Sequence, residues 1–229
     1  MYVKDHMTKN PLTVKRGTVL SEALEIMREN NFHRLPVVDD AGRLIGLVTA
    51  GLVEEESGSK STSLSIYELN YLLSRTSAES IMIKDVVTTT QDVFIEEAAQ
   101  VMIDRGISVL PVVDKENKVI GIITEKDIFQ ALTDLLGYRH QGTRFVIRCE
   151  DRPGYFTGIA NLFAENDANL ESVGVYHTEE RGTEVVVKAT GEIETEKMTE
   201  ILVKAGYKVT NVVQTTKEGT IRRFQVPEL

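Results

Sequence analysis

The sequence predicts a mixed α+β and α/β fold, in which a duplicated unit fills the first half of the chain and a different small domain the second. Two observations lead to this prediction: a segment that recurs 75 residues further along, and a change of hydrophobic pattern near residue 140. The composition agrees, because 41% hydrophobic and 27% charged residues in a chain of 229 are ordinary for a globular protein.

The repeat is clearest in a short apolar segment. Leu35–Asp39 reads Leu-Pro-Val-Val-Asp, and Leu110–Asp114 is identical. Residues Met7–Val53 align without a gap with Met82–Ile128, which indicates a duplication. Because one unit of about 50 residues buries too little surface to be stable alone, we expect the two copies to pack together.

Each copy is predicted to contain a short strand, a helix, two strands joined by a polar turn, and a second helix. The helix is indicated by apolar residues at the i, i+3, i+4, i+7 spacing of an amphipathic helix. In the first copy these elements are Leu12–Val14, Leu20–Met27, Leu35–Val38, Leu44–Val48 and a helix from about Thr49. The short strand of the second copy is expected at Val86–Thr88.

Two segments lie between the copies. Glu54–Ser65 is charged and rich in Ser and Gly, which is typical of a solvated linker. Ile66–Leu73 has the pattern of an apolar helix that either caps the pair of units or binds a partner; we expect the cap.

The second half begins where Gly137–Gly142 interrupts the helical pattern. Alternating apolar residues and helical stripes then predict the order β-α-β-β-α-β, the ferredoxin-like arrangement. The elements lie around Phe145–Cys149, Ile159–Phe163, Val173–Val175, Val185–Val187, Met198–Ala205 and Val209–Val213.

These motifs carry two resemblances. The Leu-Pro-Val-Val-Asp strands and Gly121–Asp127 (Gly-Ile-Ile-Thr-Glu-Lys-Asp) resemble a tandem pair of CBS domains. The Asp151–Gly154 turn, with Asn169 opening the next strand, resembles an ACT domain. The expected parts are a first CBS repeat (1–60), a linker with a short helix (61–78), a second CBS repeat (79–137), an ACT domain (143–215) and a C-terminal tail (216–229).

Thr124 and Asp127 form the clearest candidate binding element. A hydroxyl and a carboxylate three residues apart at the start of a helix can cap that helix. They can also hold the hydroxyls of a ribose, with a phosphate at the helix N-terminus. The CBS resemblance implies the second role, with the adenine lying against first-copy residues; the implied nucleotide-binding set is Leu12, Phe32, His33, Arg34, Thr124 and Asp127.

Two further points concern this site. His33 and Arg34 either meet phosphates or are surface charges beside a strand. The two copies also differ, because Leu52 stands where Asp127 does, although Thr49 is retained. Leu52 cannot accept a hydrogen bond from a ribose, so we predict one dominant adenosine site per chain.

The ACT resemblance implies a second ligand, an amino acid bound where the Asp151–Gly154 turn leads into a helix. Free N–H groups at that helix N-terminus can bind a carboxylate, and the implied residues are Asp151, Gly154 and Asn169. A purely structural turn is the equal alternative.

Several classes of function are disfavoured. One cysteine and no paired histidines argue against disulfides and metal sites, and phosphate-loop or nucleophile motifs are missing, so we expect no enzyme, no catalytic residues and no metal. The net charge of −9 disfavours nucleic acid as a partner. Apolar runs of about five residues are too short to cross a membrane, and no leader-like segment opens the chain, so a cytoplasmic location is expected.

The sequence therefore predicts a regulatory sensor that needs no cofactor and binds an adenosine-containing effector: AMP, ATP, S-adenosylmethionine or NAD. The alternative is an adaptor or structural interaction protein without a bound nucleotide. The modules imply a homodimer and an unknown target protein. A CBS pair followed by an ACT domain, with Tyr67–Leu73 between the repeats, is also similar to the family of acetoin-utilisation proteins, which implies a role in acetoin and butanediol use.

Overall fold

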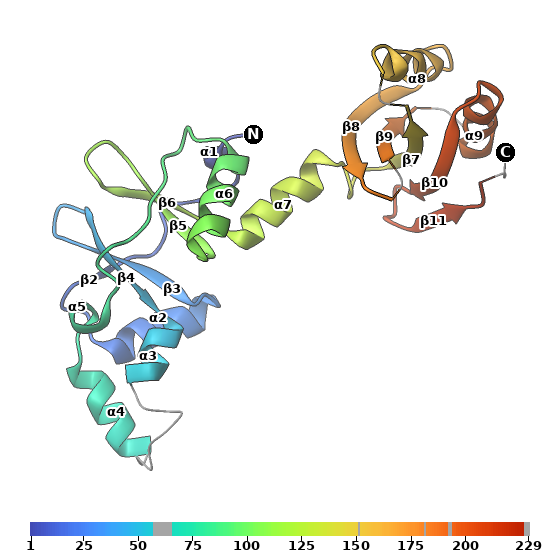
Figure 1. The fold of residues 1–229 in the computed structure, drawn as a ribbon. Helices are drawn as coiled ribbons and strands as arrows, with labels where there is room; N and C mark the ends of the chain where they lie inside the picture. Colours follow the sequence, from blue (N-terminus) through green and yellow to red (C-terminus); the bar gives the residue numbers. More distant parts are fainter. Residues whose placement is uncertain (57–65, 151, 181, 192–193, 227–229) are drawn as a thin grey trace. The chain divides into compact units, whose positions relative to one another are not determined.

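The computed structural model describes residues 1–56, 66–150, 152–180, 182–191 and 194–226 (Figure 1). They divide into two compact units, Met1–Ala131 and Leu132–Leu229. Most of the predicted linker lies outside the described residues; its first residues, Glu54 to Glu56, end a helix instead.

The first unit contains two three-stranded sheets with helices packed against them (Figure 1). Its helices are α1 (Val3–His6), α2 (Leu20–Asn30), α3 (Ala50–Glu56), α4 (Ile66–Arg75), α5 (Ala78–Ile81), α6 (Ile95–Arg105) and α7 (Glu125–Leu135), which runs on into the second unit. Its strands are β1 (Thr8–Lys9), β2 (Val14–Lys15), β3 (Arg34–Val38), β4 (Leu44–Thr49), β5 (Val109–Val113) and β6 (Val119–Thr124).

The two repeats exchange their leading segments. The N-terminal strand β1 pairs with β6 of the second repeat, giving the sheet order β1-β6-β5. Ile83, which precedes the second repeat's own strands, pairs in turn with Leu47 on β4. Val3 is accordingly buried in the core of the second repeat, and Ala78 in the core of the first.

The core confirms the amphipathic pattern of the sequence. Leu20, Ala23 and Met27 of α2 are buried, as are the equivalent Ile95, Ala98 and Met102 of α6. The predicted helix after the linker is also present as α4, whose Leu73 is buried in the first repeat's core. Both hairpins, β3–β4 and β5–β6, are antiparallel.

The short strand expected at Val86–Thr88 is wrong. Pairing there is a single bridge between Thr89 and Val112. Val86 and Val87 instead line a cavity, and Val87 packs against the second repeat's core. In this segment the backbone forms a bridge to the sheet at Thr89.

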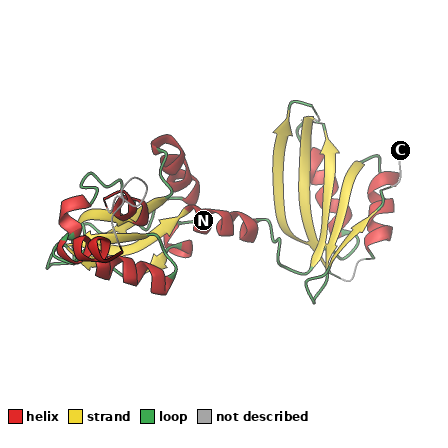
Figure 2. Ribbon diagram, turned by 90° about the horizontal axis from the view of Figure 1, so that it is seen from below, coloured by secondary structure: helices red, strands yellow, loops and turns green. Residues whose placement is uncertain are grey.

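The second unit has the predicted ferredoxin-like order with one added strand. Its elements are β7 (Gly142–Cys149), α8 (Tyr155–Ala164), β8 (Asn169–Thr178), β9 (Gly182–Thr190), α9 (Thr195–Lys204), β10 (Lys208–Thr215) and β11 (Ile221–Phe224). The sheet order is β11-β10-β7-β9-β8, and every pairing is antiparallel. Both helices cover one face (Figure 2), where Phe145, Ile159, Phe163 and Leu202 are fully buried.

Strand β11 lies within the predicted C-terminal tail, and the sequence pattern does not predict it. It pairs with β10, and Phe224 and Val226 pack against the core. Neither α8 nor α9 covers the opposite face of the sheet (Figure 2).

Candidate functional site

A cavity of about 320 Å³ lies within the first unit, where the two repeats meet. Its lining is Thr8, Pro11, Leu12, Phe32, His33, Arg34, Pro36, Val109, Ile122, Thr124, Lys126 and Asp127. All six residues of the predicted nucleotide set are therefore brought to one place. The volume is at the lower end of the range for small-molecule pockets, which is about 300–1,000 Å³.

Thr124 and Asp127 occupy the junction between β6 and α7. Asp127 Oδ2 accepts hydrogen bonds from the Thr124 backbone N–H at 2.8 Å and from Thr124 Oγ1 at 2.7 Å. This is helix capping by the third residue of the helix. Both bonds end on one oxygen, and within the described part of the chain Oδ1 has no hydrogen-bond donor. The carboxylate can therefore cap α7 and still accept a bond from a ligand.

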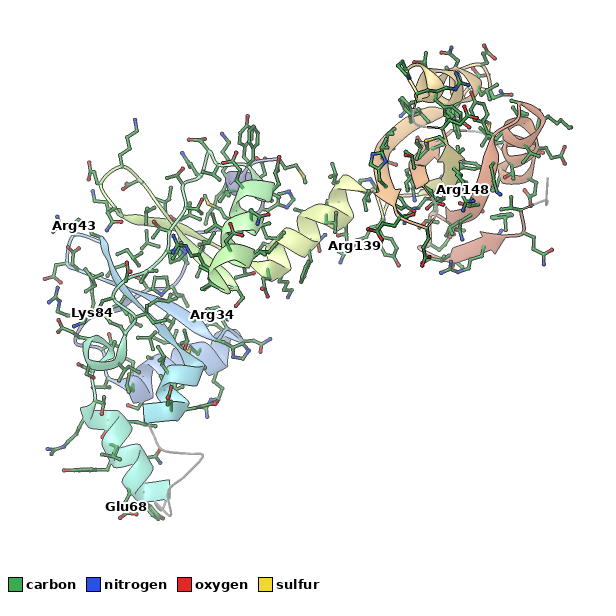
Figure 3. The ribbon with its side chains drawn as sticks, viewed as in Figure 1. Arg34, Arg43, Glu68, Lys84, Arg139 and Arg148 are labelled. Carbon is green, nitrogen blue, oxygen red and sulfur yellow. The ribbon has the colours of Figure 1, made fainter. Side chains whose placement is uncertain are left out.

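The cavity combines apolar walls with basic groups. Leu12 is 51% exposed although apolar, and Phe32 is half-buried beside it in the lining. Arg34, labelled in Figure 3, is half-buried and donates to Ser108 Oγ. His33 is exposed, while its carbonyl accepts from the Ala50 N–H at 2.8 Å.

Sequence reasoning missed part of the lining. Thr8 and Pro11 reach the cavity because the N-terminal segment pairs with β6, a long-range contact that local patterns do not encode. Lys126 could have been found, since it lies between Thr124 and Asp127 on the first turn of α7. It adds a third basic side chain to those of His33 and Arg34.

A smaller cavity, of about 240 Å³, is related to the first by the repeat. Its lining is Arg34, Leu47, Thr49, Ile83, Asp85, Val86, Val87, Gly106, Ile107, Ser108 and Val109, and most of these residues are 75 positions from a residue of the larger cavity. Here Thr49 Oγ1 accepts from the Leu52 N–H at 3.2 Å. Among the described residues Leu52 is not part of the lining, so no carboxylate stands at the helix start.

The amino-acid residues predicted for the second unit are less well gathered. Gly154 is the N-cap of α8, with φ of 82°, a left-handed conformation that glycine adopts without strain. Asn169 is exposed and opens β8, as predicted. Asp151 lies outside the described residues. The described part of the second unit has one cavity lined by Gly142 and another lined by Arg148. Neither Gly154 nor Asn169 lines either of them.

Metal ligands and membrane spans are both missing from the described residues. No group of three or more His, Cys, Asp or Glu is arranged there to hold a metal ion. No helix in the same part of the chain is both long and apolar enough to span a bilayer.

Comparison with protein families assigns both halves. Residues 3–51 and 78–134 match the CBS domain, and residues 143–207 match the ACT domain. The chain therefore carries a tandem pair of CBS domains followed by an ACT domain.

Curated relatives resemble this chain over part of their length. A homoserine O-acetyltransferase of Methanohalobium evestigatum is 36% identical over 133 residues, which are 58% of this chain and 24% of that protein. An inosine-5'-monophosphate dehydrogenase of Methanocaldococcus jannaschii is 28% identical over 219 residues, covering 89% of this chain and 40% of the enzyme. The chain spans well under half the length of either relative.

Two solved structures are similar to more than half of this chain. CBSX2 of Arabidopsis thaliana, in complex with AMP, has a TM-score of 0.51 and 27% identity, covering 58% of this chain and 97% of that one. A Vibrio cholerae protein named as the acetoin utilization protein AcuB has a TM-score of 0.51 and 29% identity, covering 59% and 93%.

Proposed function

We propose that the chain is a regulatory sensor that binds an adenosine nucleotide in the cavity of about 320 Å³. One observation carries the proposal: residues from both repeats converge on this cavity, and Asp127 keeps one carboxylate oxygen available at the start of α7. The AMP complex of the similar CBSX2 supports it.

The cavity offers a separate group to each part of the ligand. Asp127 Oδ1 accepts a hydrogen bond from a ribose hydroxyl, and the apolar surfaces of Leu12 and Phe32 cover the adenine. Arg34 and Lys126 supply positive charge for phosphates, His33 can donate a hydrogen bond from its ring, and the N-terminus of α7 aids them. AMP, ATP, S-adenosylmethionine and NAD share the adenosine that these groups recognise, so all four belong in the test.

The test is calorimetry of the full chain with each of the four ligands. A hydrogen bond to a charged group contributes about 1.5–3 kcal/mol, so Asp127→Ala should weaken binding about tenfold to a hundredfold. Asp127→Asn keeps an oxygen that can cap the helix, and it should also weaken binding while leaving α7 folded. Asp104→Ala is the matched control, because Asp104 lies on α6, accepts a hydrogen bond from the Gln100 side chain and does not line the cavity.

The asymmetry of the repeats sets the stoichiometry. We expect one nucleotide per chain, since the helix that starts beside the smaller cavity has Leu52 at the position equivalent to Asp127, and Leu52 does not line that cavity. Unchanged affinity in both Asp127 variants, or two equal sites per chain, would contradict the proposal.

The remaining parts of the proposal rest on the modules. The ACT domain would bind an amino acid near Gly154, Asn169 and Asp151, and titration with the common amino acids would test it. The chain would act as a homodimer, which light scattering would show as twice 25.6 kDa. It would regulate a target protein in the cytoplasm and would not itself be an enzyme. Its similarity to the Vibrio cholerae protein named AcuB supports a role in acetoin use.

A further inference from the structure

The face of the second unit's sheet that α8 and α9 leave uncovered contains a strongly basic cavity of about 390 Å³. Its lining is Leu136, Tyr138, Arg144, Val146, Arg148, Tyr176, Glu184, Lys188, Thr210, Asn211, Val213, Thr215, Ile221 and Arg223. Four of these side chains are cationic and one is a carboxylate. That balance is the reverse of the whole chain, whose net charge is −9. We call this site the basic cavity.

Two of the cations face each other across strands. Arg144 on β7 is paired in register with Lys188 on β9. Like charges directly opposite one another destabilise a sheet. Lys188 is also only 2% exposed, and among the described residues its ammonium has one weak contact, with Thr215 Oγ1 at 3.4 Å. A buried charge that is this poorly paired costs free energy in the unliganded protein.

The arginines are also incompletely satisfied. The Nε atoms of Arg144 and Arg148 are buried and lack a hydrogen-bond acceptor within the described parts of the chain. Arg148, labelled on β7 in Figure 3, stands opposite Glu184 in register. The Glu184 carboxylate, however, accepts from the Tyr176 hydroxyl at 2.6 Å and from Thr210 Oγ1 at 3.4 Å.

The other nearby carboxylate does not remove the imbalance. Glu171 raises the pKa of Lys188 by its charge, yet burial has the larger effect and lowers that pKa overall. Glu171 also contacts His140. Positive charge is therefore concentrated around one cavity, with two unpaired arginine Nε donors buried in its wall.

We propose that the basic cavity binds a compact anion with two or more negative charges, such as a phosphate ester or a di- or tricarboxylate. Such a ligand would be attracted by the positive charges that line the cavity and would reduce the repulsion between Arg144 and Lys188. The cavity volume suits a small molecule, and the acidic chain as a whole disfavours nucleic acid. The site is distinct from the nucleotide cavity, which belongs to the first unit.

Calorimetry of the full chain at low ionic strength, with pyrophosphate and with citrate as probes, tests this proposal. At least one probe should bind with one site per chain. Lys188→Met and Arg144→Gln should each weaken that binding about tenfold or more. Arg222→Gln is the matched control, because Arg222 neighbours Arg223 on β11 but does not line the cavity. Asp127→Ala is the second control and should leave anion binding unchanged.

Thermal unfolding provides an independent readout. The bound probe should raise the melting temperature of the wild type but not that of Lys188→Met. Binding of pyrophosphate alone, citrate alone or both would support a phosphate, a carboxylate or a charge-selected ligand respectively. The proposal is overturned if neither probe binds at millimolar concentration, or if Arg222→Gln weakens binding as much as Lys188→Met. It is also overturned if the Lys188 and Arg144 variants fold and retain full affinity.

Discussion

Gly46 and Gly121 occupy equivalent positions in the two hairpins, and each lies beneath a methionine that belongs to the leading segment of the other repeat. A Cβ on Gly46 would approach Met82 Cγ to 2.7 Å and the Ile83 carbonyl oxygen to 3.0 Å. The three atoms nearest to a Cβ on Gly121 would all belong to the Met7 side chain, with Sδ at 2.5 Å. The exchanged segments therefore pack closely against the glycine of both hairpins, and at Gly46 a backbone atom takes part in the contact.

Gly46→Ala should therefore destabilise the protein more than Gly121→Ala. At Gly46 a backbone atom is in the way, and overpacking of this kind costs about 1–3 kcal/mol. At Gly121 a flexible methionine side chain can move, and the reduced entropy of the unfolded chain offsets part of the strain. Denaturant unfolding measures both. Equal losses, or a larger loss at Gly121, would show that the segments are not packed as described.

Lys188 gives a pH dependence with a defined sign. Its pKa in the folded chain is lowered from 10.5, chiefly by burial. As pH rises through the folded pKa towards 10.5, the folded state releases the proton first and the unfolded state still holds it. Stability therefore rises with pH in that window. The stability advantage of Lys188→Met over the wild type should shrink over the same range; an advantage that is constant or grows with pH would contradict the assignment.

Single residues were predictable where a motif named them. Thr124 and Asp127 stand at a strand-to-helix junction that the pattern shows directly, and the repeat offset identified Leu52 as the difference between the copies. The basic cavity was not predictable, because Arg144, Arg148 and Lys188 occupy alternate strand positions that normally face solvent. Whether such a face is open or partly buried depends on β11 and on Leu136 and Tyr138, which contribute to its lining.

At the scale of elements, the exchanged N-terminal segment connects the fold to the site. Val3 donates to the Val93 carbonyl at 2.9 Å, and Thr8 pairs with Ile122 on β6. Thr8, Pro11 and Leu12 then line the nucleotide cavity. The segment belongs to the first repeat in sequence but stabilises the second.

Deleting residues 1–10 should consequently loosen the second repeat. Hydrogen exchange should increase most in β6, which loses its edge pairing, and in α6, whose core loses Val3. Strands β3 and β4 should keep their protection. The affinity for the nucleotide should also fall, because Thr8 is lost from the cavity wall. An increase in exchange confined to the first repeat would contradict the exchanged topology.

Elements were predictable in proportion to their hydrophobic periodicity. The stripes of α2 and α6 define helices without reference to the rest of the chain. Strand β11 has no such signal, since Ile221, Arg222 and Arg223 are exposed. It is a strand because β10 offers a free edge, and the position of β1 likewise depends on a partner more than a hundred residues away.

For the whole molecule, the two units should fold independently. Each has its own core, and no residue is shared between the clusters of the first unit and that of the second. Cleavage within Gly137–Gly142, between the end of α7 and β7, should leave two folded pieces. Circular dichroism and thermal unfolding of the separate pieces would check this. An unfolded 143–229 fragment would mean that the second unit depends on the first.

The central claim is that the cavity lined by Thr124 and Asp127 holds an adenosine nucleotide. A crystal structure of the chain grown with AMP tests it most directly. We predict one AMP per chain, with a ribose hydroxyl at about 2.5–3.0 Å from an Asp127 carboxylate oxygen and the adenine against Leu12 and Phe32. AMP bound only in the smaller cavity beside Thr49, or outside both cavities of the first unit, would contradict the claim.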